Sequence, residues 1–187
     1  SRLGEYTTET PKPMVKIGPK PILWHIMKHY SLYKNKNFYI ALGYKSEVIK
    51  KYFLDFHLID NNFTIDLNKG SVKTEGCKED WRVSLIDTGI NTMTGGRLKR
   101  MKPFLKNETF FMTYGDGLCD VNLDELLKFH KDHGRLVTVT AVHPSARFGE
   151  LNFEGDYVNK FVEKPQTFQG WVNGGYFVME PEVFDFL

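Results

Sequence analysis

The segment ETFFMTYGDG, residues 108–117, joins an apolar stretch to a short polar turn. Its aromatic and β-favouring residues predict a strand over residues 108–114 with the composition of a buried strand. Glycines on both sides of Asp116 let the backbone approach a ligand and leave the carboxylate exposed. The segment therefore predicts a buried strand that carries Asp116 at its carboxyl end.

Helices and strands alternate around this strand through residue 143, which indicates βαβ units and a parallel or mixed sheet. The expected helices are 21–34, one capped by Ser46, 96–105, 123–133 and one that starts at 182. The other expected strands are 37–42, 62–68, 82–88, 136–143, 150–153, 157–162 and 171–179. Ligands of such sheets bind outside the carboxyl ends of the strands, where the sequence places Thr88, Gly89, Asp116, Glu163 and Lys164.

The composition fits one domain with a sizeable core, since 41% of the 187 residues are hydrophobic and 14% are aromatic. The net charge of +2 gives no reason to expect nucleic acid or a membrane surface as a partner. Cys77 and Cys119 are too few for a disulfide framework, so we interpret them as free thiols in a reducing compartment. With no signal peptide and no apolar run of about 18 residues, the sequence predicts a soluble cytoplasmic protein.

The Gly115-Asp116-Gly117 turn is a candidate magnesium site. Mg²⁺ favours one or two carboxylates together with waters and phosphate oxygens, and a lone aspartate at a strand end suits that preference. Gly-Asp-Gly is also ordinary turn chemistry. Its position directly after an apolar strand favours the metal interpretation.

The segment Thr94-Gly95-Gly96-Arg97-Leu98-Lys99-Arg100 is a candidate anion or nucleotide site. Glycines that open a helix leave backbone N–H groups free for an anion or a base edge. Arg97 and Arg100 lie about one turn apart and can face the same site. The alternative is a solvated basic helix that begins with a glycine-rich turn.

Two cations near the start of the chain, Arg2 and Lys12, could also bind phosphate. Pro11 and Pro13 stiffen the backbone around Lys12, which fixes the direction of its ammonium group. An arginine such as Arg2 can hold a phosphate with two parallel hydrogen bonds. The alternative is a loop that carries two surface cations.

Polar residues near the end of the chain suit a sugar phosphate. Glu163 can accept hydrogen bonds from sugar hydroxyls, Lys164 can bind phosphate, and the Asn173 amide can donate and accept. The alternative is a charged strand end followed by a β-bulge at Gly174 and Gly175.

Three other residues invite a catalytic interpretation that the sequence does not favour. His130 and His133 lie one turn apart, but no third ligand is near in sequence and His130 falls on the apolar helix face. Cys119 adjoins Gly-Asp-Gly but lacks a partner base, which disfavours a nucleophilic role.

Taken in order, these motifs resemble the sugar-phosphate nucleotidyltransferases, and in particular their cytidylyltransferase branch. The resemblance covers essentially the whole chain, and the ordered set of motifs is more specific than any one of them. It rests on Ser1-Arg2-Leu3, Lys12-Pro13-Met14, residues 20–27, Asp87-Thr88-Gly89, residues 93–100, residues 113–117, Arg147-Phe148-Gly149, Glu163-Lys164-Pro165 and Asn173-Gly174-Gly175.

The resemblance implies a Rossmann-like mixed, mostly parallel sheet flanked by helices, of the nucleotide-diphospho-sugar transferase type. It also implies magnesium-dependent transfer of a cytidylyl group from CTP to α-D-glucose 1-phosphate, which gives CDP-glucose and pyrophosphate. This product usually feeds deoxysugar synthesis for surface polysaccharides such as the O-antigen of lipopolysaccharide. The family commonly forms homo-oligomers.

The resemblance also implies a role for each candidate residue. Arg2 and Lys12 would be catalytic, and Asp116 would hold Mg²⁺. The nucleotide would contact Arg2, Leu3, Lys12, Thr94, Gly95, Arg97 and Gly115. The sugar phosphate would contact Gly149, Glu163, Lys164, Asn173 and Gly174.

Compared with the family pattern, residues 1–187 are expected to form a single nucleotidyltransferase domain without the first strand, the glycine loop and the C-terminal segment with a second magnesium aspartate. Two alternatives remain at this point. One is the same reaction with UTP or dTTP. The other is a nucleotide-sugar-binding homologue that performs no turnover.

Overall fold

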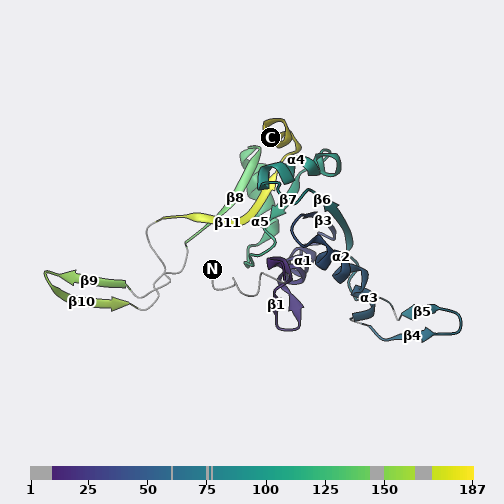
Figure 1. Ribbon diagram of the computed structural model, residues 1–187. Helices are drawn as coiled ribbons and strands as arrows, with labels where there is room; N and C mark the ends of the chain where they lie inside the picture. Colours follow the sequence, from purple (N-terminus) through teal and green to yellow (C-terminus); the bar gives the residue numbers. More distant parts are fainter. Residues whose placement is uncertain (1–9, 60, 75, 77, 144–149, 163–169) are drawn as a thin grey trace.

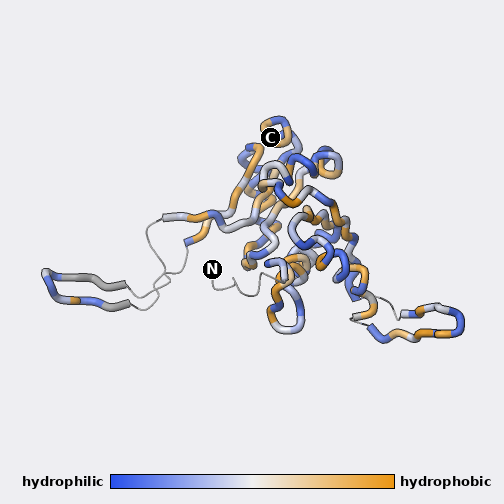
Figure 2. Tube along the Cα trace, in the orientation of Figure 1, coloured by the Kyte–Doolittle hydropathy of each residue, from blue (hydrophilic) through white to orange (hydrophobic). Residues whose placement is uncertain are grey.

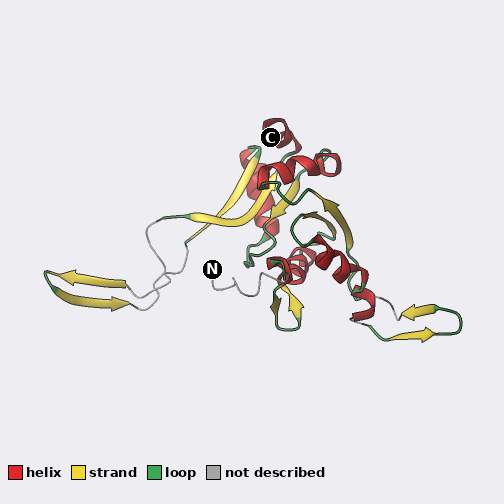
Figure 3. Cartoon of the chain, viewed as in Figure 1, coloured by secondary structure: helices red, strands yellow, loops and turns green. Residues whose placement is uncertain are grey.

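The computed structural model describes residues 10–59, 61–74, 76, 78–143, 150–162 and 170–187. Helices and short sheets gather in a central body, from which two strand hairpins project on opposite sides (Figure 1). These projecting hairpins are β4 (Phe63–Asp66) with β5 (Ser71–Thr74), and β9 (Glu150–Glu154) with β10 (Tyr157–Val162). Figure 3 shows that the helices are confined to the body.

One part of the body is built on a parallel strand pair, β3 (Asn37–Leu42) and β6 (Arg82–Asp87). Two helices accompany it, α1 (Ile22–Leu32) before β3 and α2 (Ser46–Leu54) between the strands. Leu23 and Met27 of α1, Leu42 of β3 and Ile49 of α2 form one buried cluster. The apolar faces of α1, β3 and α2 therefore pack into one core, which holds the carboxyl end of β3 in place.

The other part is a three-stranded sheet in the order β7 (Phe110–Thr113), β11 (Val172–Met179) and β8 (Val137–Val142). Helix α5 (Leu123–His133) begins at Asn122, whose side chain accepts hydrogen bonds from the N–H groups of Asp124 and Glu125. It ends at Gly134, which adopts a left-handed φ of 61°. The β7 end that carries Asp116 thus belongs to a different sheet from β3.

The two parts meet in a second core cluster of Ile26, Tyr30, Leu123 and Tyr176. The Tyr30 and Tyr176 rings are stacked, with centroids 5.8 Å apart. Burial raises the pKa of Tyr30 well above its ordinary value, and burial with the nearby Cys119 raises the pKa of Tyr176 to about 12. Both phenols therefore stay neutral near pH 7 and serve as core packing.

The expected mixed α/β fold is confirmed, but the expected predominance of parallel pairing is not seen among the described residues. There, parallel pairing is confined to β3 and β6, whereas β11 is antiparallel to both β7 and β8. Because β11 lies between them, β7 and β8 still run in the same direction. The antiparallel pairing comes from β11, which is inserted between β7 and β8, and from the hairpins β1–β2 (Lys16–Ile17 and Lys20–Pro21), β4–β5 and β9–β10.

Several boundaries differ from the sequence-based expectation. Lys45, with a left-handed φ of 51°, precedes α2, so Ser46 is the first helical residue and not its cap. The basic helix α4 (Thr94–Leu105) begins two residues early, and the last helix is a 3₁₀ segment, η3 (Pro181–Phe186). The remaining short elements are η2 (Lys12–Met14), β1 (Lys16–Ile17), β2 (Lys20–Pro21) and α3 (Phe56–Ile59).

The projecting β4–β5 hairpin carries exposed apolar side chains. Phe63, Ile65 and Val72 are all exposed, and Figure 2 shows apolar residues along this arm. The expected strand over 62–68 is therefore one half of a hairpin and adds no strand to a central sheet. Separately, no helix among the described residues has the length and apolar character needed to cross a membrane.

Candidate active site

The structure brings Lys12 to the end of β7. The Lys12 Nζ lies 3.5 Å from an Asp116 carboxylate oxygen, and the two side chains are 57% and 41% exposed. A Cβ at Gly115 would lie only 3.0 Å from the Pro13 ring, so glycine permits the close approach of these segments. The cation that the sequence proposed for phosphate and the carboxylate that it proposed for a metal thus lie together at a strand end.

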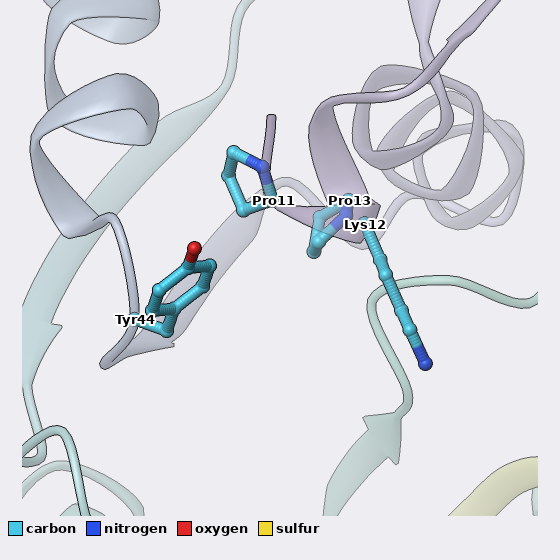
Figure 4. A pocket seen from close by; sticks show the side chains of 4 residues that line it. All are labelled: Pro11, Lys12, Pro13 and Tyr44. Carbon is cyan, nitrogen blue, oxygen red and sulfur yellow. The ribbon is translucent and has the colours of Figure 1, made fainter. Parts of the chain in front are cut away.

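An open hollow adjoins this pair. Pro11, Lys12, Pro13 and Tyr44 line it, and Tyr44 comes from the turn that follows β3. Figure 4 shows the Tyr44 ring beside Pro11, while the Lys12 side chain extends away from Tyr44. The prolines therefore separate an aromatic face from the ammonium group.

Arg97, a predicted nucleotide contact, is anchored to the ends of β3 and β6. Its Nη1 donates to the Leu42 carbonyl at 2.9 Å and to Thr88 Oγ1 at 2.7 Å, and its Nη2 donates to the Ile90 carbonyl at 3.2 Å. A Cβ at Gly43 would overlap the guanidinium group. Of its five N–H donors, the Nε–H and one Nη2–H have no partner among the described residues.

Arg100, one turn further along α4, binds the same loop. Its Nη1 donates to the Thr88 carbonyl and, at 2.8 Å, to Thr92 Oγ1. A Cβ at Gly89, which has φ of 83°, would lie 2.5 Å from this nitrogen. The two arginines therefore fasten α4 to residues 88–92, which is more specific than a solvated basic face.

We predict that Thr88→Val destabilises the fold by about 1–3 kcal/mol. Thr88 is fully buried, and its hydroxyl donates to the Leu42 carbonyl at 2.7 Å while it accepts from Arg97. Valine keeps the shape but removes both hydrogen bonds. Urea unfolding measures the change, with Thr64→Val on the exposed β4 hairpin as the control. Equal stability of the two variants would contradict the anchoring role.

The β-bulge at the glycines, which the sequence offered as the alternative to a sugar-phosphate site, is present, because the β11–β8 register shifts between Asn173 and Phe177. The Asn173 side chain lies in this bulge, where its Oδ1 accepts from the Gly175 N–H at 2.8 Å. Its Nδ2 donates to the Tyr114 hydroxyl at 3.2 Å. The bulge therefore brings Asn173 to the residue that precedes Gly115-Asp116.

The other predicted site residues divide into two groups. Thr94 and Gly95 open α4, and Gly95 lies near Leu187, 3.7 Å from where its Cβ would stand. A second group lies outside the described residues, namely Arg2, Leu3, Gly149, Glu163 and Lys164.

The donor set at Asp116 suits Mg²⁺ bound jointly with a phosphorylated substrate. The described residues contain no group of three or more His, Cys, Asp or Glu side chains placed to hold a metal by themselves. One exposed carboxylate would supply a single ligand, and Mg²⁺ favours waters and phosphate oxygens at its remaining positions.

The histidine pair of α5 has a structural role. His130 is 1% exposed, and its ring nitrogens contact Thr138 Oγ1 at 2.7 Å and Glu180 Oε1 at 3.1 Å. His133 Nε2 contacts the same threonine hydroxyl at 2.6 Å. These contacts tie α5 to β8 and to the residue after β11.

Sequence reasoning assigned no role to two side chains that the structure places at the site, Tyr44 and Tyr114. Each directly follows, or nearly follows, the carboxyl end of a strand, β3 or β7. Their position after a strand was therefore the available signal. Tyr114 instead closed a stretch predicted to be a buried strand, and both side chains are exposed.

An α/β domain that presents a lysine and an aspartate together at a strand end suits the class of enzymes that act on phosphorylated substrates. The family model described as nucleotidyl transferase matches residues 1–187, and the chain belongs to this family.

Two relatives show which members of this family the chain resembles. The chain is 43% identical over 187 residues to a Bacillus subtilis (strain 168) protein named "Probable glucose-1-phosphate cytidylyltransferase", covering 100% of this chain and 73% of that protein. It is 46% identical over 190 residues to the glucose-1-phosphate cytidylyltransferase of Salmonella typhi, covering 100% and 74%.

A solved structure confirms the fold. HddC from Yersinia pseudotuberculosis superposes with a TM-score of 0.63 at 22% identity, over 96% of this chain and 71% of that one.

Proposed function

We propose that this protein transfers a cytidylyl group from CTP to α-D-glucose 1-phosphate, which gives CDP-glucose and pyrophosphate. The observation that carries the proposal is the Lys12–Asp116 pair at the end of β7, since it joins the two charges that nucleotidyl transfer needs. Relatives at 43–46% identity, named for this activity and matched along the whole of this chain, support the choice of substrates.

Lys12 stabilises charge at the reacting phosphorus. In the transfer, a phosphate oxygen of glucose 1-phosphate attacks the α-phosphorus of CTP, and pyrophosphate leaves in line. The ammonium group of Lys12 neutralises charge that the α-phosphate and the sugar phosphate bring together. The prolines on both sides of Lys12 hold it in position before the substrates arrive.

Asp116 holds Mg²⁺ in this proposal. The bound ion supplies charge neutralisation on the phosphate oxygens. Gly115 and Gly117 keep the turn narrow enough for phosphate oxygens to approach the carboxylate. Asp116 would hold the ion, and the Lys12 ammonium would face the phosphates.

The remaining residues divide between nucleotide and sugar. Thr94, Gly95 and Arg97 contact the nucleotide. The Nε–H and the second Nη2–H of Arg97, which have no partner in the described part of the chain, are the donors available for it. Asn173 and Gly174 contact sugar hydroxyls. The resemblance assigns Arg2, Leu3 and Gly115 to the nucleotide, and Gly149, Glu163 and Lys164 to the sugar phosphate.

The choice of nucleotide is tested by pyrophosphate release with glucose 1-phosphate and each of CTP, UTP, dTTP and GTP. We expect kcat/KM for CTP to exceed that for the others by at least about 10²-fold, because a site built to hydrogen-bond one base edge rejects bases that leave its groups unpaired. An equal or higher value with UTP or dTTP would replace the proposed nucleotide. No release with any of them would favour a binding homologue without turnover.

The compartment, the domain and the oligomeric state of the enzyme are part of the same proposal. We place it in the cytoplasm as a single domain over residues 1–187, because both substrates are metabolites of that compartment. The homo-oligomer implied by the resemblance stays a prediction, which light scattering on the purified protein tests. The product is an activated sugar, so the enzyme that consumes it modifies or transfers glucose.

A further inference from the structure

Tyr114 lies between the Asp116 turn and the bulge of β11. Its backbone N–H donates to the Gly175 carbonyl at 3.3 Å, and Thr113 Oγ1 donates to the same carbonyl at 2.9 Å. Its ring packs edge-on against Phe177, with centroids 5.8 Å apart. Both the backbone and the ring of Tyr114 are therefore fixed against β11.

Gly175 makes this packing possible. It has φ of 81°, and a Cβ there would lie 3.1 Å from Tyr114 Cδ2. A larger residue at 175 would meet strain in the backbone and crowding against the ring at the same time. The bulge thus fits the tyrosine ring closely.

The opposite flank of the bulge is held by Thr140 of β8. Its Oγ1 donates to the Tyr176 carbonyl at 3.1 Å and accepts from the Tyr176 N–H at 3.2 Å. A Cβ at Gly174 would lie 2.8 Å from the same Thr140 oxygen. With both flanks held, the backbone of the bulge is a rigid base for the Asn173 side chain.

The Asn173 carboxamide is held at both ends. Its Oδ1 accepts from the Gly175 N–H at 2.8 Å, and its Nδ2 donates to the Tyr114 hydroxyl at 3.2 Å. One N–H and one lone pair of this amide are then left, together with the phenol O–H of Tyr114. Both side chains are exposed, with Tyr114 40% exposed. These donors and acceptors therefore face solvent in a fixed arrangement.

We propose that Tyr114 is a positioning residue for sugar binding, which acts through Asn173. This inference rests on the proposed function, in which Asn173 contacts the sugar hydroxyls. The Tyr114 hydroxyl fixes the plane of the amide before the sugar binds, so less rotational freedom is lost on binding. Because Tyr114 adjoins Gly115-Asp116, the same residue joins the sugar side of the site to the metal side.

Tyr114→Phe tests the inference, because it keeps the ring packing and removes only the hydroxyl. We expect the Kd for CDP-glucose, measured by titration calorimetry, to rise by roughly 3- to 10-fold, while the Kd for CTP changes by less than about twofold. The KM for glucose 1-phosphate rises in the same proportion with kcat nearly unchanged. The control is Tyr157→Phe on β10, where the side chain is 81% exposed.

Whether Tyr114 acts through Asn173 is tested in an Asn173→Ala background. There, Tyr114→Phe is expected to add less than about twofold to the Kd for CDP-glucose, because the amide that it positions is gone. Full additivity of the two changes, an unchanged Kd in Tyr114→Phe alone, or an equal rise for CTP and CDP-glucose would each overturn the inference.

The Kd for CDP-glucose tests the role of Tyr114 separately from the proposed transfer reaction. If the parent protein binds CDP-glucose without turnover, the proposed function fails and the Kd values still decide the role of Tyr114. If the parent protein does not bind CDP-glucose at all, both proposals are overturned.

Discussion

Lys12→Ala is expected to lower kcat for CDP-glucose formation by about 10²- to 10³-fold, with a small change in stability. The kcat falls because the variant lacks the preorganised positive charge at the reacting phosphorus. No other described side chain replaces this charge at the same position. The ion pair of Lys12 with Asp116 is largely exposed, and such pairs contribute roughly 0–1 kcal/mol to folding. Lys12→Ala is therefore expected to lose activity and to stay folded.

Single-turnover kinetics with saturating CTP and glucose 1-phosphate measure the effect on the chemical step. Lys16→Ala is the matched control, since Lys16 is an exposed lysine four residues away in β1. A kcat for Lys12→Ala within about threefold of the parent value would contradict the catalytic role. A large and equal loss in both variants would assign the effect to the segment and not to the Lys12 ammonium.

Asp116→Asn is expected to lower kcat/KM by about 10²-fold or more and to shift the Mg²⁺ requirement to higher concentration. The amide keeps the shape of the carboxylate but removes the charge that binds a hard cation. It also removes the partner of Lys12. The variant therefore loses metal affinity and keeps the lysine that stabilises the phosphates.

Binding of Mn²⁺, followed by its electron paramagnetic resonance signal in the presence of CTP, gives a readout that does not depend on turnover. We expect the affinity of the complex for Mn²⁺ to fall in Asp116→Asn and to stay unchanged in Asp120→Asn, an exposed carboxylate four residues further on. Unchanged Mn²⁺ binding in Asp116→Asn would remove this residue from the metal site.

Sequence patterns predicted the individual elements well where local physics decides them. The expected spans 37–42, 123–133 and 157–162 coincide with β3, α5 and β10. For α5, an apolar stripe and a left-handed Gly134 act within a few residues of the helix ends. Strand order depends on distant segments, so the insertion of β11 between β7 and β8 was not predictable.

The same distinction applies to the site. The position of Asp116 at a strand end was predictable because its strand and its turn are adjacent in sequence. The approach of Lys12 to Asp116 joins segments far apart in the chain, and it depends on the contact of Gly115 with Pro13. Arg97 shows the opposite case, since its charge pattern suggested either a ligand contact or a solvated helix face. The structure adds an anchoring role, because Arg97 donates to the Leu42 carbonyl at the end of β3 and to the Ile90 carbonyl in the loop after β6.

The most direct test of the proposed activity is a ³¹P magnetic resonance spectrum of the protein with CTP, glucose 1-phosphate and Mg²⁺. Transfer to the sugar phosphate predicts that the CTP and glucose 1-phosphate signals disappear together. A sugar diphosphate with two coupled phosphorus signals and an equal amount of pyrophosphate would take their place. Formation of CMP and pyrophosphate with glucose 1-phosphate unconsumed, or a spectrum that does not change, would contradict the account.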